Sequence, residues 1–349
     1  MGKSGRNRSR GGPTFGGRAE EVRPMFPIDF DRRGEVCGRK MRQTPRLGLR
    51  GVIGRFVCLP LLLPVLAAAV RPALAQGAEA RETPAALAAR IDKLLGADNL
   101  VAWCIVPFDA GKRTPQQRAE MVRELGLHRV AYDWREEHVP TFEEEILQYK
   151  AHGLEFFAFW SWHDAFEPLV RRYGIKPQIW FTCPSPEAED DQRRVAAAAA
   201  ELLPLVRKTA ELRLPLGLYN HGGWGGEPQN MVAIVQYLRN RYAAEHVGIV
   251  YNFHHGHGHS ERFADALKQM QPYLLCVNLN GMCDANEVSE QQILPIGAGR
   301  HEFVMIRQLI TSGYEGAIGI LDHREQVDAA ESLRQNLDGL RELTARLKR

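Results

Sequence analysis

Eight short apolar runs, each followed by a run of helical period, constrain this chain more than any other feature. The predicted strands and helices alternate from residue 100 to residue 347: strands at 100–108, 128–134, 154–162, 177–182, 216–220, 247–253, 274–279 and 317–321, and helices at 114–125, 141–151, 164–173, 189–212, 228–244, 260–270, 302–311 and 326–347. The strands lack strict alternation, as parallel strands covered by helices do. Eight β/α units in about 250 residues match one (β/α)₈ barrel, an α/β fold.

An open doubly wound sheet is the competing architecture. It would need a glycine-rich phosphate turn after the first strand. Residues 108–111 (FDAG) do not form one, and no P-loop occurs elsewhere. We therefore predict a closed TIM barrel.

Helix boundaries carry local signals. Thr114 with Pro115 is a good N-cap followed by proline at the first helical position, and Gly126 ends that helix. Thr141, with Glu144 three residues later, matches a capping box. One further helix is expected at 84–95, before the barrel.

The N-terminal region resembles a targeting segment. Residues 57–70 form an apolar run of 14, with arginines before it and Ala73-Leu74-Ala75 after it. This pattern predicts a secretory signal peptide over residues 41–75, cleaved after Ala75. The run is shorter than the roughly 20 residues of a membrane helix, and an uncleaved anchor is the alternative. We expect a periplasmic or secreted protein without stable membrane insertion after cleavage.

The remaining boundaries follow from this assignment. Residues 1–40 are interpreted as an over-extension of the reading frame or as a disordered segment. Residues 76–98 form a lead-in, and residues 99–349 form the barrel. The part after Ala75 has 30 Lys and Arg against 37 Asp and Glu, a net charge of −7. An acidic protein is a poor candidate for nucleic-acid binding.

Cysteine spacing argues against a structural metal. Cys104, Cys183, Cys276 and Cys283 follow the signal region and form neither a C-x-x-C pair nor a zinc pattern. Cys104 and Cys276 lie in apolar runs, so we predict buried free thiols there.

Polar clusters rich in His and Asn stand at the carboxyl ends of the late strands, where TIM barrels carry their chemistry. Three segments of the second half resemble the xylose isomerase-like TIM barrels. They are YNHGGW (219–224), FHHGH (253–257) and residues 293–320, which contain a P-x-G-x-G turn and a G-Y-x-G turn. The resemblance covers residues 100–349. It implies a sugar isomerase or epimerase that holds one divalent metal with carboxylates and a histidine, and moves a proton.

The chain departs from that family at the ligand positions. Tyr219 stands where the family has Glu, Asn252 where it has Asp, and Leu321 where it has the last Glu. Residues 278–281 (NLNG) replace a His-x-Lys-Asp segment. These changes argue against hard-cation binding in the family's own geometry.

One hypothesis is a rebuilt metal site. His221, His254, His255 and His257 are the candidate ligands, with His259 and His323 on neighbouring loops. The glycines of the H-H-G-H-G-H run let the backbone bend. An imidazole-rich site suits a transition metal better than Mg, and Zn, Mn, Co and Ni are the candidates. The alternative is a flexible, exposed loop that binds metal adventitiously.

The other hypothesis is carbohydrate handling without metal. The candidate binding residues are Asn220, Asn252, Asn278 and Asn280, whose amides suit vicinal hydroxyls, and Trp134, Trp162 and Trp224, which could stack on a sugar face. Packing at the barrel rim is the alternative for the tryptophans.

Proton transfer requires acid/base groups. The candidates are His221, His255, Asp133 and His163, whereas Asp322 is interpreted as a loop charge. We therefore predict an exported sugar isomerase or epimerase acting on a carbohydrate or polyol, a free sugar or glycoside rather than a phosphorylated one. The alternative is a non-catalytic carbohydrate-binding barrel.

Overall fold

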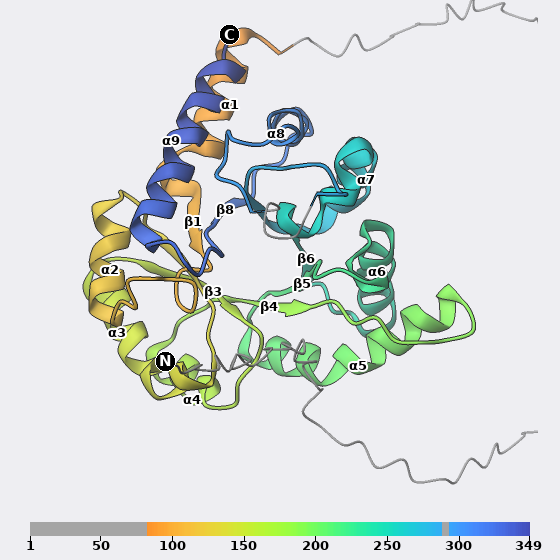
Figure 1. Cartoon of the computed structure of the whole chain (residues 1–349). Helices are drawn as coiled ribbons and strands as arrows, with labels where there is room; N and C mark the ends of the chain where they lie inside the picture. Colours follow the sequence, from red (N-terminus) through yellow and green to blue (C-terminus); the bar gives the residue numbers. More distant parts are fainter. Residues whose placement is uncertain (1–81, 288–292) are drawn as a thin grey trace, which may run out of the picture. The chain divides into compact units, whose positions relative to one another are not determined.

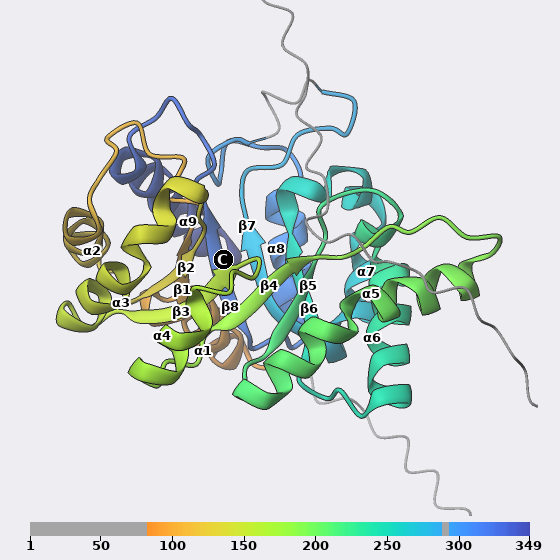
Figure 2. The same ribbon diagram turned by 90° about the horizontal axis from the view of Figure 1, so that it is seen from below.

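The eight predicted strands form one closed parallel barrel in chain order, with β8 paired to β1. A computed structural model describes residues 82–287 and 293–349. Helices follow the strands and surround the barrel (Figures 1 and 2). The predicted (β/α)₈ fold is confirmed.

The observed elements follow the predicted ones closely. The strands are β1 (Leu100–Trp103), β2 (Arg129–Tyr132), β3 (Glu155–Trp160), β4 (Gln178–Thr182), β5 (Leu216–Tyr219), β6 (Val247–Asn252), β7 (Leu274–Leu279) and β8 (Ala317–Leu321). The helices are α1 (Pro84–Leu95), α2 (Pro115–Glu124), α3 (Phe142–Ala151), α4 (Phe166–Tyr173), α5 (Asp191–Leu212), α6 (Pro228–Tyr242), α7 (Phe263–Met270), α8 (Glu302–Thr311) and α9 (Ala329–Leu347). The helix expected at 84–95 is α1, which lies along α9 (Figure 1).

The predicted signal peptide at 41–75 and the segment at 1–40 lie outside the described residues. Within residues 82–287 and 293–349, no helix is long and apolar enough to cross a membrane.

Large aromatic rings fill the barrel interior. Trp103 packs edge-on against Trp180 with ring centroids 4.9 Å apart, and Trp160 packs against Tyr219 at 4.7 Å. Glycine makes room for them: a Cβ on Gly217 would lie 3.2 Å from the Trp180 ring and 2.5 Å from Val250. The barrel is therefore a packed core, and ligands are expected only at its ends.

The predicted N-terminal cap of one helix differs from the observed one. Thr114 is the N-cap of α2, as expected, and it forms a capping box with Gln117. The capping box predicted at Thr141 is wrong, because its hydroxyl donates to the carbonyl of His138 at 2.9 Å. A short 3₁₀ helix, η2 (Glu136–Thr141), runs directly into α3, so the Phe142 amide already bonds to the Val139 carbonyl. Backbone carbonyls thus replace the side-chain cap.

Candidate active site

The carboxyl ends of three strands carry residues with strained backbones. Cys104 after β1, Ser161 after β3 and His323 after β8 have φ of 62°, 60° and 47°. Non-glycine residues in this left-handed region cost on the order of 1–3 kcal/mol each and cluster at functional sites. The strain turns the chain sharply at one face of the barrel.

Two buried carboxyl groups lie at this face. Asp133, after β2, is 2% exposed, and Asp322, after β8, is fully buried. None of their four carboxyl oxygens makes a hydrogen bond of normal geometry, although the Val106 amide and the Ser332 hydroxyl lie near enough to lower the pKa of Asp133 and Asp322, respectively. Buried polar atoms without partners are rare in folded proteins and are most often explained by function.

Burial controls the protonation of both groups. It raises the pKa of Asp133 to about 7, against the opposing charge of Arg135. It raises the pKa of Asp322 to about 8, against Ser332 and Arg324, while the charge of Asp133 adds to the shift. Near neutral pH, Asp133 can therefore lose and regain a proton while Asp322 stays protonated.

Cys104 lies within the electrostatic reach of both carboxyl groups. Burial raises the pKa of its thiol well above the usual value, and the charges of Asp133 and Asp322 raise it further. It is a buried free thiol, as the sequence predicted, and so is Cys276. A thiol with a raised pKa is a poor nucleophile, which leaves the carboxyl groups as the proton-transfer candidates.

A stack of rings borders the carboxyl groups. Phe108 contacts His323 with ring centroids 3.9 Å apart, and the Arg135 guanidinium lies over Phe108 at 5.2 Å. Burial lowers the pKa of His323 to about 4, and the charge of Arg135 contributes. His323 is therefore a neutral imidazole at physiological pH.

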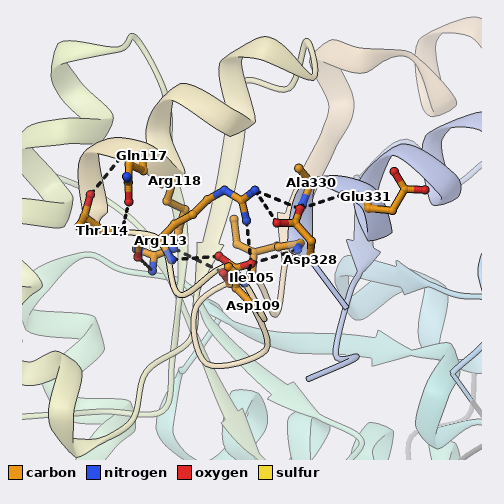
Figure 3. Close-up of polar contacts among 11 residues, drawn as sticks. Ile105, Asp109, Arg113, Thr114, Gln117, Arg118, Asp328, Ala330 and Glu331 are labelled. Atoms are coloured by element: carbon orange, nitrogen blue, oxygen red, sulfur yellow. Dashed lines mark hydrogen bonds and ion pairs between the residues drawn. The ribbon is translucent and has the colours of Figure 1, made fainter. Parts of the chain in front are cut away.

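A polar brace holds this stack in place (Figure 3). One oxygen of Asp109 accepts hydrogen bonds from the Gly111 amide at 2.9 Å, the Arg113 guanidinium at 2.7 Å and the Ala329 amide at 3.1 Å. Arg113 also donates to both carboxylate oxygens of Asp328, the N-cap of α9, at 3.0 and 2.8 Å. The brace thus joins the loop after β1 to the start of α9 and keeps Phe108 beside His323.

Histidine rings crowd together beside this stack. His255 lies 4.4 Å from both His221 and His254, centroid to centroid, and His254 lies 5.6 Å from His323 and 6.3 Å from His257. Burial lowers the pKa of His255 to about 2, and the neighbouring histidines lower it further. The structure therefore brings the predicted His221 and His255 together as neutral, packed rings.

The loop that carries these histidines is not the exposed, flexible one of the alternative interpretation. It forms two short 3₁₀ helices, η4 (Phe253–His255) and η5 (His257–Arg262). His257 and His259 are each 5% exposed. His257 Nδ1 lies 3.0 Å from the Cys283 carbonyl, and His259 Nδ1 lies 2.9 Å from the Tyr251 hydroxyl. These contacts fix the loop against the barrel.

The donor atoms do not fit the predicted metal. Across the two described ranges, no group of three or more His, Cys, Asp or Glu residues is placed to hold an ion. Tyr219 and Leu321 stand at two of the family's ligand positions. The Tyr219 hydroxyl accepts hydrogen bonds from Trp103 Nε1 at 3.2 Å and from the side-chain amide of Asn252. Leu321 is apolar. Neutral groups that hydrogen-bond to one another therefore stand in place of the carboxylates that a hard divalent cation needs.

The four predicted sugar-binding asparagines are at most 1% exposed. Asn220 bridges two strands. Its side-chain nitrogen donates to the backbone carbonyl of Asn252 at 3.0 Å, and its side-chain oxygen accepts from the backbone N–H of Asn252 at 2.6 Å. Asn278 accepts from the Cys276 thiol at 3.6 Å, and Asn280 donates to the Gly281 carbonyl at 2.8 Å. These side chains make internal hydrogen bonds, and the buried side-chain nitrogen of Asn278 is left without a partner.

The predicted tryptophans lie half-buried on the rim. Trp134 donates to the Trp160 carbonyl at 2.7 Å. Trp162 lies beneath Lys208 at 5.2 Å, and Trp224 beneath Arg194 at 4.6 Å. Each ring is held in place and keeps part of its surface exposed.

His163, the fourth acid/base candidate, packs against Trp134 at 5.0 Å and Phe142 at 5.7 Å. Its ring contacts are therefore with the rim and with α3, and the structure does not bring it together with His221 and His255.

Sequence reasoning missed Asp322 and gave Arg135 no role. Asp322 follows an apolar strand directly, which was the available signal. The loop after β1 and α9 both cover Asp322. The loop after β1 lies more than a hundred residues away from Asp322 along the chain, so the local sequence could not distinguish Asp322 from a solvated loop charge.

The comparisons with known proteins agree with the fold. No family model and no curated protein sequence matches the chain. Solved structures do match. The apo form of 3-keto-D-glucoside 4-epimerase, YcjR, from E. coli has a TM-score of 0.53 at 15% identity, covering 71% of this chain and 99% of that one.

Two other solved structures are similar to a comparable degree. The IolI protein with a bound zinc atom has a TM-score of 0.55 at 10% identity, over 71% of this chain and 99% of that one. The probable 3-DHS dehydratase AsbF of Bacillus anthracis has a TM-score of 0.54 at 12% identity, over 70% and 98%. At 10–15% identity, the likeness to these structures shows that this chain shares their fold.

The buried Asp133 generates a prediction about stability. Because its folded pKa of about 7 lies above the unfolded value of 3.8, stability is lost as pH rises from about 4 to about 7. Asp133→Asn removes that loss. We expect the variant to match the parent near pH 4 and to exceed it by up to about 4 kcal/mol at pH 8, measured by urea denaturation. A pH-independent difference between the two proteins would contradict the assignment.

Proposed function

We propose that this protein is a sugar isomerase or epimerase in which Asp133 transfers a proton at the carboxyl end of the barrel. The observation that carries the proposal is the pair of buried carboxyl groups, Asp133 and Asp322, which make no hydrogen bonds of normal geometry. A carboxyl group with a pKa near the working pH is an efficient general base and acid. The names of two proteins of similar fold, an epimerase of a keto-glucoside and a dehydratase, support carbohydrate chemistry.

The proposed reaction begins with ionised Asp133. Its carboxylate removes a proton from the carbon beside a sugar carbonyl, the C–H electron pair becomes a C=C bond, and the carbonyl π pair moves to oxygen. In this proposal, Arg135 and the neutral His323 stabilise the negative charge on that oxygen. Return of the proton to the neighbouring carbon, with a proton shift between the two oxygens, yields the isomer. Delivery to the opposite face of the original carbon by a second acid yields the epimer.

Asp322 sets the charge of the site in this scheme. It stays protonated up to a pH of about 8 and so does not repel the enediolate. The half-buried Trp134 and Trp162 offer ring faces for the sugar. Because the donor atoms do not fit the metal implied by the resemblance, no step is assigned to a metal.

The rival proposal is a non-catalytic carbohydrate-binding barrel. It is favoured by the internal hydrogen bonds of Asn220, Asn252 and Tyr219. Tyr219 and Asn252 stand at positions where the sequence resemblance implies metal ligands. Such a protein would bind sugars without exchanging their protons.

Solvent exchange distinguishes the two proposals. We expect the parent protein to incorporate deuterium from D₂O into a C–H position of its sugar, followed by NMR. Asp133→Asn should reduce the rate by about 10²-fold or more, the range typical of a lost general base. Asp265→Asn, an exposed residue of α7, is the matched control and should not change the rate.

The same assay tests the role of a metal. Protein dialysed against EDTA should exchange at the parent rate. Loss of exchange that zinc, manganese, cobalt or nickel restores would favour the rebuilt histidine site instead. Sugar binding without exchange under every condition would favour the non-catalytic barrel.

The pKa values give a pH prediction for the reaction. The rate should rise with pH through about 7, as Asp133 ionises, and fall above about 8, as Asp322 ionises and repels the enediolate. The two apparent values belong to the coupled pair. In Asp322→Asn the fall at high pH should disappear while the rise remains, as measured by kcat/KM. A falling limb that survives this substitution would remove Asp322 from the scheme.

We also propose that the protein is exported, with residues 41–75 as its signal peptide. The supporting pattern is the positive, apolar and small-residue order of that segment. Expression of the full chain in a Gram-negative host should give a periplasmic protein that begins at Gln76, as determined by N-terminal sequencing. Retention in the cytoplasm of an intact chain would contradict export.

A further inference from the structure

A buried ion pair lies beside the loop after β1. Arg118 of α2 is 3% exposed and Glu145 of α3 is fully buried. Nη1 of Arg118 donates to both carboxylate oxygens of Glu145 at 2.8 Å. Burial lowers the pKa of Arg118, but contacts led by the Glu145 carboxylate raise it above the usual value, so the guanidinium stays charged.

The other nitrogens of Arg118 hold the backbone of this loop. Nε donates to the Ile105 carbonyl at 3.4 Å, and Nη2 donates to the Arg113 carbonyl at 2.8 Å (Figure 3). Cys104, directly before Ile105, has a left-handed backbone, so the chain turns sharply here. Arg118 thus fixes the direction of the Ile105 carbonyl just after the turn.

The peptide bond between Ile105 and Val106 connects Arg118 to Asp133. Its carbonyl accepts from Arg118, and its N–H is the Val106 amide, which lies near enough to Asp133 to lower the pKa of the carboxyl group. A trans peptide is planar, and its carbonyl and N–H point in opposite directions, so a partner that fixes one of them also fixes the other. Hydrogen bonds in such a chain also polarise one another.

We propose that Arg118 is a positioning residue for Asp133, and that it acts through the peptide bond between Ile105 and Val106 to keep the Val106 amide directed at the carboxyl group. This inference rests on the proposed function, in which ionised Asp133 removes a proton from the sugar. A buried carboxylate without a hydrogen-bond donor is strongly unfavourable. The Val106 amide supplies that donor when Asp133 ionises, and Arg118 itself is assigned no contact with the sugar.

Other titratable groups also face Asp133. They come from its own strand and loop and from the ends of β1 and β8, and they are Tyr132, Arg135, Cys104 and Asp322. Arg118 differs from them because it is hydrogen-bonded to the peptide that carries the Val106 amide. Its effect on Asp133 should therefore depend on the geometry of the guanidinium as well as on its charge.

The NMR signal of the Val106 amide tests the proposal in valine-labelled protein. A hydrogen bond to ionised Asp133 should move this proton signal with a midpoint at a pH of about 7, and Asp133→Asn should abolish the change. Arg118→Lys keeps a positive charge beside Glu145 but loses the planar fork of donors, so the change should shrink by about twofold or more. A Val106 signal that does not respond to pH in the parent, or that responds equally in Arg118→Lys, would overturn the proposal.

A double variant separates this role from ordinary stabilisation. Arg118→Met combined with Glu145→Gln leaves no buried ion alone, and the midpoint of Asp133, followed by its carboxyl carbon signal, should rise by about one pH unit or more. Arg341→Met combined with Asp338→Asn removes an exposed pair of α9 and should leave the midpoint unchanged. Equal midpoints in the two double variants would contradict the proposal. If the first double variant does not fold, Arg118→Lys decides alone.

Failure of this inference differs from failure of the proposed function. Deuterium exchange that requires Asp133 but has the same pH dependence in the parent and in Arg118→Lys would overturn the positioning role and retain the isomerase. A Val106 signal that follows Asp133 and depends on Arg118, in a protein that exchanges no sugar proton, would support the contact and overturn the isomerase.

Discussion

The pairing of β8 with β1 is the constraint on which the site depends. Its register places Trp103 opposite Leu321, and the Asp322 amide donates to the Trp103 carbonyl at 3.0 Å. This one ladder brings the last strand end beside the first, so Asp322 and His323 meet Cys104 and Phe108. The brace of Asp109, Arg113 and Asp328 reinforces the same junction beyond the strands. Without closure, the two carboxyl groups would lie at opposite edges of an open sheet.

The groups gathered there are held in states that destabilise the fold. Two carboxyl groups are buried without hydrogen bonds of normal geometry, and three residues at strand ends have left-handed backbones. Each feature costs free energy that the aromatic core and the helical layer offset. Such concentrations of unfavourable features are expected where structure serves chemistry more than stability. Most of these features lie at the junction of β1, β2 and β8, where the proposed base Asp133 stands.

The opposite side, at β5 to β7, holds a network of neutral side chains. The Tyr219 hydroxyl accepts hydrogen bonds from the side chain of Asn252 and from Trp103 of β1. Tyr219 and Asn252 stand at positions where the sequence resemblance implies carboxylate ligands. His221 and His255 of the next loops pack ring against ring, and burial lowers the pKa of both. One fold hosts many chemistries because the strand ends can change while the barrel core remains. Here the positive and acidic groups lie around β2 and β8, away from the ligand positions implied by the sequence resemblance.

The sequence by itself determined the architecture, the order of the eight β/α units, most helix boundaries and the face that carries the polar groups. These follow from short-range periodicity and caps such as Thr114, which act within a few residues. Only the tertiary structure determined which individual side chains are buried and which partners they bind. Asp322 and Asn220 look alike in sequence, as polar residues after apolar strands, yet one makes no hydrogen bond of normal geometry and the other bridges two strands. The Thr141 side chain likewise does not cap α3, because a 3₁₀ helix runs directly into the start of α3. Burial, protonation and partner choice depend on groups distant in the chain, and those meet only when the barrel closes.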